Sequence, residues 1–289
     1  MDYQGNIFRP PSEANSILLQ VTRGCSHNKC TFCDLYKGTR FALKDEATIE
    51  RDLEFARTYC RRQNRLFLCD GDALILSQKR LVALLTAIRE QLPWVTRIGT
   101  YANTRSIHSK TAEQLEELRH LGLAIAYMGL ESGDDVTLEA IVKGADSARM
   151  IETGRKIRAA GIKLSITVML GIAQEERSAI HAEATGRVLS AIDPEYVGVL
   201  SLMLTPGSPL YTAWREGRFV LPGPDAMLVE LRWMLAATNL SDGYFHANHA
   251  SNYLPIKAHL PHDKAKTLHL IDLALHGAIG LKPEYLRGL

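Results

Sequence analysis

Short apolar runs alternate with amphipathic stretches along the first two thirds of the chain. The apolar runs have the length of strands buried on both faces, and the amphipathic stretches repeat their apolar positions with the period of a helix. Six strand-then-helix units in succession predict a parallel sheet covered by helices. The predicted strands are residues 17–22, 65–69, 95–101, 124–129, 163–170 and 196–202, and the predicted helices are residues 46–61, 77–91, 111–121, 136–141, 147–160 and 179–192.

Local signals refine this pattern and show where it ends. Ser77 is placed to cap the start of the second helix, and Gly161 stands where a C-terminal cap glycine belongs. Beyond residue 202 several prolines break the rhythm, and we expect a helical remainder with one irregular stretch over residues 241–255. Periodicity leaves the choice between an open doubly wound sheet and a complete or partial barrel open.

Composition adds limits to the class of protein. The 289 residues carry 34 basic and 32 acidic side chains, a net charge of +2, which gives no general electrostatic case for binding nucleic acid or an anionic membrane. No apolar run approaches the roughly 18 residues of a membrane span, and the N-terminus lacks a signal-peptide pattern. We therefore expect a cytoplasmic protein without a membrane association.

Three of the five cysteines crowd into nine residues. Cys25, Cys30 and Cys33 have a C-x4-C-x2-C spacing, whereas Cys60 and Cys69 stand apart, too few and too separated for a second cluster. An odd number with this clustering, in a reducing compartment, points to metal binding or catalysis and not to disulfides. One loop that carries three thiolates suits an iron–sulfur cluster, and this loop follows the first strand, where active sites of parallel sheets lie.

A structural zinc site is the competing interpretation, with His27 as the fourth ligand. Structural zinc sites usually combine two pairs of ligands across a longer spacer, and no second pair follows here. The pattern favours iron and sulfur over zinc.

The loop resembles the cluster loop of the radical S-adenosylmethionine (SAM) superfamily, C-x3-C-x-aromatic-C, with one extra residue between the first two cysteines. The resemblance implies that Cys25, Cys30 and Cys33 hold a [4Fe–4S] cluster. It also implies that Phe32, in the aromatic position, packs near the adenine of SAM.

Four more segments match this superfamily in order and placement. Asp70, Gly71 and Asp72 resemble the motif that binds the SAM amino group, although Asp-Gly is also a common turn pair. The segment from Gly129 to Gly144 resembles G-x-E-S-G … K-G of the branch that contains oxygen-independent coproporphyrinogen oxidases and methylthiotransferases. By this resemblance the further SAM-binding residues are Glu131, Ser132, Lys143, Gly171 of an adenine-flanking segment, and Thr205 of a T-P-G-S-P-L-Y segment.

The resemblance covers residues 15–220 and implies an α/β fold, a partial (β/α)6 TIM-like barrel with a C-terminal, mostly helical extension. The domain organisation that follows is an N-terminal arm over residues 1–14, the barrel over 15–220 and the extension over 221–289. The implied cofactors are a [4Fe–4S] cluster and SAM, which is cleaved reductively to a 5′-deoxyadenosyl radical that abstracts hydrogen from a substrate.

The substrate is the open question. We expect a small molecule, with an electron donor such as flavodoxin or ferredoxin as partner; a tRNA- or peptide-modifying enzyme and a non-catalytic zinc- or iron-binding barrel are the alternatives. Six of the ten histidines lie between His246 and His276. One hypothesis is that His246, His249 and Asn252 contact substrate at the barrel mouth, and the alternative is a surface loop or a dimer contact.

Overall fold

The computed structural model describes residues 1–288, which divide into two compact units. The first unit contains residues 1–28, 38–128 and 156–164. The second contains residues 29–37, 129–155 and the chain from residue 165 onward. The cysteine loop is therefore shared between the units, with Cys25 in the first and the other two loop cysteines in the second.

Parallel strands form the centre of the first unit. Their order is β1, β4, β5 and β6, and Leu18 of β1 stands in register with Phe67 of β4. Residues 66–69 are all buried, as expected of an inner strand with both faces covered. The strands of this unit are β1 (Ile17–Gln20), β2 (Thr22–Arg23), β3 (Ala42–Leu43), β4 (Arg65–Cys69), β5 (Arg97–Tyr101) and β6 (Leu123–Glu131), which runs on into the second unit.

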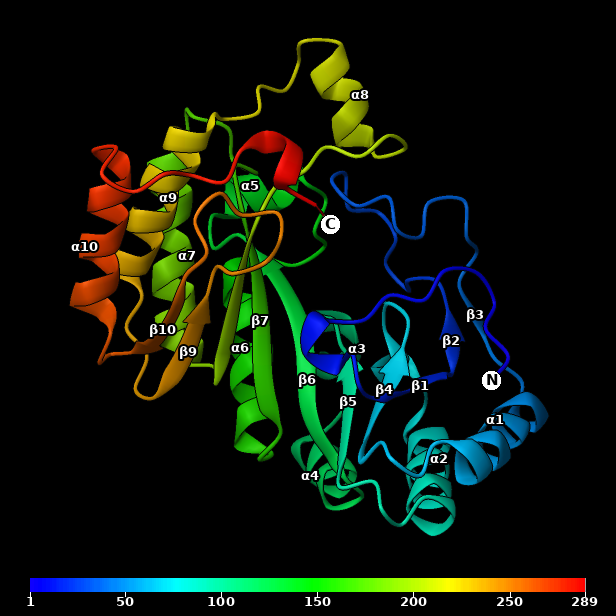
Figure 1. Ribbon diagram of the computed structural model, residues 1–289. Coiled ribbons are helices and arrows are strands. Elements are labelled where there is room, and N and C mark those ends of the chain that lie inside the picture. The colour runs from blue at the N-terminus through cyan, green and yellow to red at the C-terminus, as the bar shows by residue number, and fades with distance from the viewer. Residues whose placement is uncertain (289) are drawn as a thin grey trace. The chain divides into compact units, whose positions relative to one another are not determined.

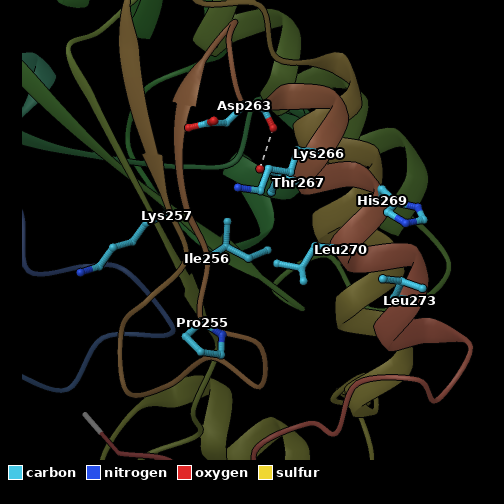
Figure 2. Close-up of a pocket in the computed structure, with 9 residues that line it drawn as sticks. All are labelled: Pro255, Ile256, Lys257, Asp263, Lys266, Thr267, His269, Leu270 and Leu273. Atoms are coloured by element: carbon cyan, nitrogen blue, oxygen red, sulfur yellow. Dashed lines mark hydrogen bonds between the residues drawn. The ribbon is translucent and has the colours of Figure 1, made fainter.

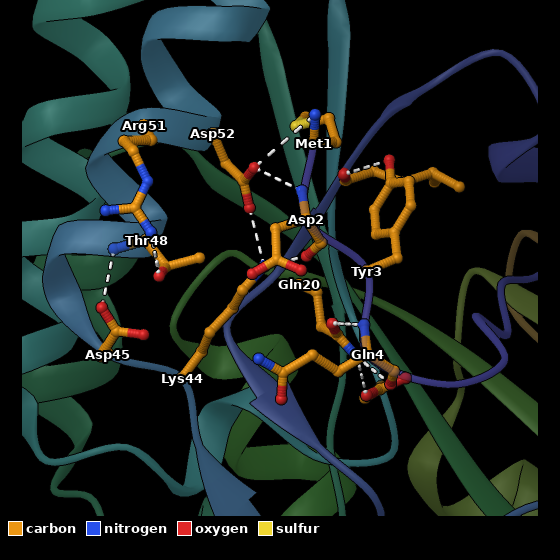
Figure 3. Close-up of polar contacts among 12 residues, drawn as sticks. Met1, Asp2, Tyr3, Gln4, Gln20, Lys44, Asp45, Thr48, Arg51 and Asp52 are labelled. Carbon is orange, nitrogen blue, oxygen red and sulfur yellow. Dashed lines mark hydrogen bonds and ion pairs between the residues drawn. The ribbon is translucent and has the colours of Figure 1, made fainter.

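The helices of the first unit follow its strands. They are α1 (Glu46–Tyr59), α2 (Gln78–Gln91), α3 (Thr104–His108) and α4 (Ala112–His120), with short 3-10 turns η1 (Pro11–Glu13) and η2 (Ala73–Ile75). The N-terminal residues are hydrogen-bonded to the unit, as Figure 3 shows. Asp52 of α1 accepts from the backbone N–H of Asp2 at 2.6 Å and from Lys44 Nζ at 2.7 Å, and Gln4 donates its N–H to Gln20 at 2.8 Å.

Strands β7 to β10 form the sheet of the second unit. Strands β7 (Lys163–Leu170), β8 (Tyr196–Ser201) and β9 (Gly243–His246) are parallel neighbours, and β10 (Lys257–Leu260) pairs antiparallel with β9. Alternate residues of β7 and β8 are buried and partly exposed. Since successive side chains of a strand point to opposite faces, one face of this sheet is partly exposed and the other is buried.

Helices α7 (Ser178–Ile192), α9 (Pro224–Ala237) and α10 (Lys264–Leu275) cover that face and stand side by side in Figure 1. Gly186 of α7 allows the close approach of α9, because a Cβ there would lie 2.5 Å from the Cβ of Ala237. The other helices are α5 (Asp135–Ala140), α6 (Ser147–Ala159), α8 (Pro209–Arg215) and the 3-10 turn η3 (Glu284–Leu286).

Most predicted elements are confirmed. Strands β4 and β7 have the predicted bounds, Ser77 caps α2 by accepting from Arg80 N at 3.4 Å, and Gly161 has a φ of +75°. Three expectations are wrong. Helix α3 lies in a stretch without a predicted element. Strand β9 lies inside the stretch predicted as irregular, because its four residues become a strand only by pairing with β8. Strand β10 lies in the remainder predicted as helical, because Lys257–Leu260 pairs antiparallel with β9.

Within residues 1–288, no helix combines the length and the apolar character that crossing a bilayer requires.

Candidate functional site

The predicted SAM-amino motif directly follows β4. The backbone N–H of Gly71 donates to the carbonyl of Gly24 at 3.2 Å, which fixes the motif to the start of the cysteine loop. Asp70 has a φ of +69° and accepts from Gln20 Nε2 at 2.7 Å. A β1 side chain thus holds Asp70, whose left-handed backbone conformation is uncommon for a residue other than glycine.

Asp72 is a buried carboxylate with one oxygen engaged. Its Oδ2 accepts from Ser26 Oγ at 2.7 Å and from Asn103 Nδ2 at 2.6 Å. Its Oδ1 is buried and has no hydrogen-bond partner among the described residues. Burial raises the pKa of the Asp72 carboxyl to about 6, although the hydrogen bonds from Ser26 and Asn103 act in the opposite direction. An acceptor in this state suits a ligand ammonium group.

The cysteines differ in environment. Cys25, Cys30 and Cys33 are half-buried reduced thiols. Cys69 is buried at the end of β4, and burial raises the pKa of its thiol; burial also raises the pKa of Cys60, which caps α1. Across residues 1–288, no three His, Cys, Asp or Glu side chains are arranged to hold a metal ion.

Thr31, between Cys30 and Phe32, connects three of the predicted SAM-binding segments within the second unit. Its backbone N–H donates to the carbonyl of Ile141 at 3.0 Å, and its carbonyl accepts from the N–H of Leu210 at 2.8 Å. Ile141 precedes Lys143, and Leu210 belongs to the T-P-G-S-P-L-Y segment. The backbone therefore brings these three segments together.

Phe32 packs at the carboxyl ends of β7 and β8. It contacts a cluster of Leu138, Ile141 and Ile172 and a second cluster that includes Leu202. Its side chain is partly buried. The ring therefore lies beside Ile172, next to Gly171 of the predicted adenine-flanking segment.

Glu131 and Lys143 contact each other. Lys143 Nζ lies 2.9 Å from Glu131 Oε1, and both side chains are largely buried. Glu131 has a φ of +63°, and its carboxylate occupies the space beside Gly129, where a Cβ would lie 2.1 Å from Oε1 and 2.9 Å from Lys143 Nζ. A side chain at Gly129 would therefore displace the ends of the Glu131 and Lys143 side chains. Gly133 meets the backbone of Ala184 on α7 in the same way, at 2.5 Å.

A buried polar chain connects Ser132 to Gly171. Ser132 Oγ lies 2.8 Å from His181 Nδ1, and Glu230 Oε1 accepts from the Gly171 N–H at 2.8 Å. His181 Nε2 lies 3.4 Å from Glu230 Oε1 but makes no hydrogen bond among the described residues. Glu230 also accepts from Ser178 Oγ. Ser132, His181 and Glu230 are fully buried. Side chains of α7 and α9 therefore hold two predicted SAM-binding segments in place.

Thr205 is half-buried at the turn before α8. Its carbonyl accepts from the N–H of Ser208 at 3.2 Å and from the Ser208 hydroxyl at 3.0 Å. Ser208 in turn caps α8 by accepting from Tyr211 N at 3.1 Å. The Thr205 backbone is therefore fixed by the helix that follows it.

The histidine-rich tail follows β9. Asn252 is buried, and its amide accepts from Ser201 Oγ at 2.9 Å and donates to the carbonyl of Val199 at 2.7 Å, so it fastens the tail to β8. His246 and His249 are half-buried, and burial lowers the pKa of each imidazole. A nearby positive charge lowers it further, from Lys257 at His246 and from Lys282 at His249. His249 Nδ1 lies 2.9 Å from Ser251 Oγ.

The chain was compared with known proteins. Residues 19–183, more than half of the chain, match the family model described as the radical SAM superfamily. The chain belongs to the radical SAM superfamily. The sequence-based assignment is confirmed.

Relatives of the radical SAM chain are distant. The heme chaperone HemW of Bacillus subtilis (strain 168) is 23% identical over 204 residues, which are 68% of this chain and 53% of the relative. The chain thus spans about half the length of this curated relative.

Solved structures confirm the fold. Coproporphyrinogen III oxidase (HemN) from Escherichia coli has a TM-score of 0.55 at 18% identity, and the match covers 76% of this chain and 51% of the HemN chain. Methylornithine synthase (PylB) has a TM-score of 0.54 at 16% identity, and the match covers 78% of this chain and 63% of the PylB chain. These similarities support the predicted α/β partial barrel.

A [4Fe–4S] cluster and SAM are the cofactors of this superfamily. The chemistry of the donors in this chain suits both, although the three loop thiols do not converge on one point within residues 1–288. Three reduced thiols lie in one short loop, and the buried, unpartnered Oδ1 of Asp72 offers an acceptor for an ammonium group. The assignment of individual residues to these cofactors stays a prediction.

Sequence reasoning missed Asn103, His181 and Glu230. Asn103 follows β5 at the carboxyl edge of the sheet, and that position alone could have marked it as a candidate. His181 and Glu230 lie on the inner faces of α7 and α9, where an ionisable residue in an otherwise apolar helix face is the available signal.

Proposed function

We propose that this radical SAM protein is an enzyme that cleaves SAM reductively at a [4Fe–4S] cluster and removes a hydrogen atom from a small-molecule substrate. The observation that carries the proposal is the backbone of Thr31, which ties the cysteine loop to the segments of Ile141 and Leu210. A structural metal loop needs no such connection to the segments that resemble a SAM site.

Cys25, Cys30 and Cys33 would hold three irons through thiolates, and the fourth iron would take the amino and carboxylate groups of SAM. When bound, the cluster and SAM supply the electron transfer and carbon–sulfur cleavage that generate the hydrogen-abstracting radical. The protein contributes binding, orientation and exclusion of water.

The remaining residues would orient SAM. Asp72 Oδ1 would accept a hydrogen bond from the SAM ammonium group, since the other oxygen is occupied by Ser26 and Asn103. Lys143 would pair with the SAM carboxylate, and Glu131 would accept from the ribose or the methionine end. Asp70 and Gly71 would shape the amino-group turn beside the cysteine loop.

The adenine would lie between apolar and backbone groups of the second unit. Phe32 packs beside Ile172, and the Gly171 N–H is already committed to Glu230. Thr205, with its carbonyl engaged by Ser208, would line the opposite side of the purine. Ser132 would act through His181 as a positioning residue.

The expected setting is cytoplasmic, with flavodoxin or ferredoxin as the electron donor. His246 and His249 would contact the substrate, and Asn252, whose amide is engaged with β8, would hold their loop in place. Replacing His249 with Ala should lower substrate turnover but leave uncoupled SAM cleavage unchanged. Loss of the cluster in that variant would contradict this role.

The alternative substrates are tRNA and peptides. A gel shift with bulk tRNA separates the first from a small molecule, because a small-molecule enzyme leaves the RNA unshifted. A non-catalytic zinc barrel would be colourless after anaerobic purification, whereas a cluster protein is brown.

Haem binding is a second candidate function, since the HemW relative is named a heme chaperone. The specific observation in its favour is that His246 and His249 are half-buried with lowered pKa values, so neutral imidazoles are available as iron ligands. Titration with hemin would give a Soret shift that disappears in the double alanine variant if this function holds.

The test of the main proposal is anaerobic reconstitution with iron and sulfide, followed by SAM and dithionite, with 5′-deoxyadenosine measured by chromatography. Wild type and the matched control Cys60→Ala should form product, and Cys33→Ala should form none. A reconstituted wild-type cluster that leaves SAM intact, or a protein that holds only zinc, would contradict the proposal.

A further inference from the structure

The second unit has a sheet face that its helices leave partly exposed. In β8, Val197 and Val199 are buried, whereas Tyr196, Gly198 and Leu200 are partly exposed. The register continues this alternation into β7 and β9, so residues opposite Gly198 lie on the same face. This exposed face is hereafter the inner face.

One row of the inner face is aromatic. Tyr196 and Tyr244 stack with ring centroids 5.9 Å apart, and Tyr244 stacks on His259 at 4.6 Å. His259 is fixed by Asp242, whose Oδ1 lies 2.5 Å from its Nε2. The three rings therefore form a ladder across β8, β9 and β10, with Tyr244 43% exposed at its centre.

The next row contains Gly198 between Thr167 of β7 and His246 of β9. A Cβ at Gly198 would meet only the Ile166 carbonyl oxygen, at 3.9 Å, and its φ lies outside the left-handed range. Neither packing nor backbone conformation therefore requires a glycine here. A glycine inside a strand weakens the strand, and a ligand that approaches the backbone closely is one reason for a glycine at such a position.

The same row ends in a cation. Lys257 of β10 stands in register with His246 and is exposed. Figure 2 shows Lys257 turned away from α10, while Ile256 points toward that helix. The groove between β10 and α10 in Figure 2 is lined by Ile256, Leu270 and Leu273 on the side of α10, and Lys257 lies at its edge.

We propose that the gap over Gly198 binds a planar aromatic ring that carries a carboxylate, with the ring against Tyr196 and Tyr244, hydrogen bonds from Thr167 and His246, and the carboxylate toward Lys257. Burial lowers the pKa of His246, so its imidazole is neutral and offers one donor and one acceptor. The aromatic ladder supplies stacking, and Asp242 is committed to His259.

The gap over Gly198 lies close enough to the predicted SAM-binding segment to hold a substrate. Thr167 and Gly171 lie on one strand and its extension, four residues apart, which is about 13 Å along the strand. The inference that the ligand is the substrate rests on the proposed function. Binding itself does not, because it is measured without SAM.

The test is saturation-transfer NMR on the anaerobically purified protein, with indole-3-carboxylate as probe and cyclohexanecarboxylate as the non-planar control. The wild type should saturate the indole protons and leave the cyclohexane protons unsaturated. Gly198→Val should weaken binding at least about tenfold, since its branched side chain fills the gap while suiting a strand. Lys257→Ala should weaken it about two- to fivefold, and the matched control Lys266→Ala, on α10, should leave it unchanged.

Circular dichroism and thermal melting confirm that each variant is folded, and Gly198→Ala replaces the valine variant if the latter does not fold. Equal binding of both probes, no binding of indole-3-carboxylate to the wild type, or unchanged binding in the folded Gly198 variant would each overturn the proposal. None of these results depends on SAM cleavage, so failure here is distinct from failure of the proposed function.

Discussion

Lys143 Nζ lies 2.9 Å from Glu131 Oε1, so the two predicted SAM-binding side chains form a pair with each other. Both are largely buried, where an isolated charge would be costly. The pair keeps the carboxylate and the ammonium group in the protein interior at the end of β6.

This pair leads to a prediction on SAM binding. Replacing Glu131 with Gln should raise the Kd for SAM about tenfold, because a charge-assisted contact is lost and Lys143 is left without its counter-charge. Equilibrium dialysis of the reconstituted protein measures the change. Glu139→Gln, on the exposed side of α5, is the control and should bind like wild type. Equal affinities for both variants would remove Glu131 from the SAM site.

Gly129 should tolerate alanine poorly, because the carboxylate of Glu131 and the ammonium group of Lys143 must both move to make room. An alanine Cβ would lie 2.1 Å from Glu131 Oε1, so Gly129→Ala should cost about 1–3 kcal/mol of stability and also weaken SAM binding. Gly280, with nothing within 4 Å of its Cβ position, is the control for the same substitution. Thermal melting compares the two, and equal melting temperatures would show that the space at Gly129 is not limiting.

Asp72 predicts a pH dependence. Burial raises its carboxyl pKa from 3.8 to about 6, so ionisation is less favourable in the folded than in the unfolded chain. The free-energy cost of ionising Asp72 in the folded protein is absent below pH 4. It grows as the pH rises from 4 to 6 and reaches its full value above pH 6. Asp72→Asn should therefore stabilise the protein at pH 7.5, by up to about 3 kcal/mol, and not at pH 4.

The affinity for SAM should rise with pH, whereas the contribution of Asp72 to stability falls. Since the ionised carboxylate would bind the SAM ammonium group, wild-type affinity should rise between pH 5.5 and 7.5, and Asp72→Asn should bind weakly at every pH. Dialysis over this range measures both proteins. A wild-type profile as flat as that of the variant would contradict the role of Asp72.

The buried chain through His181 should support both stability and SAM binding. His181→Leu leaves Ser132 and Glu230 without their shared partner, which should cost about 2–4 kcal/mol. SAM affinity should fall too, because Gly171 is held by Glu230. The control is His120→Leu at an exposed position of α4. If His181→Leu melted at the same temperature as the control, the contacts of His181 would contribute nothing to stability.

The sequence predicts the fold where local signals agree with packing. The run over Lys163–Leu170 is an apolar strand of ordinary length, and its bounds are confirmed. Strand β9 was missed because Gly243–His246 is short, and its strand character comes from pairing with residues distant in the sequence.

In the candidate site, too, motifs in the sequence predict some residues, whereas others follow only from tertiary contacts. Glu131 and Lys143 were found because the motif preserves their order, whereas their mutual contact depends on the left-handed backbone at Glu131 and the open space beside Gly129. His181 and Glu230 belong to no motif, and only the packing of α7 against α9 brings them together. Positioning residues of this kind follow from tertiary contacts, which a single sequence does not show.

The central claim is that SAM binds at a cluster held by the three loop cysteines. Electron paramagnetic resonance of the dithionite-reduced, reconstituted protein tests it most directly, with spectra recorded before and after SAM is added. We predict a [4Fe–4S]⁺ signal whose g-values shift with SAM in wild type and in Cys60→Ala, and no such signal in Cys33→Ala. A wild-type cluster signal that SAM leaves unchanged, or one that persists in Cys33→Ala, would contradict the claim.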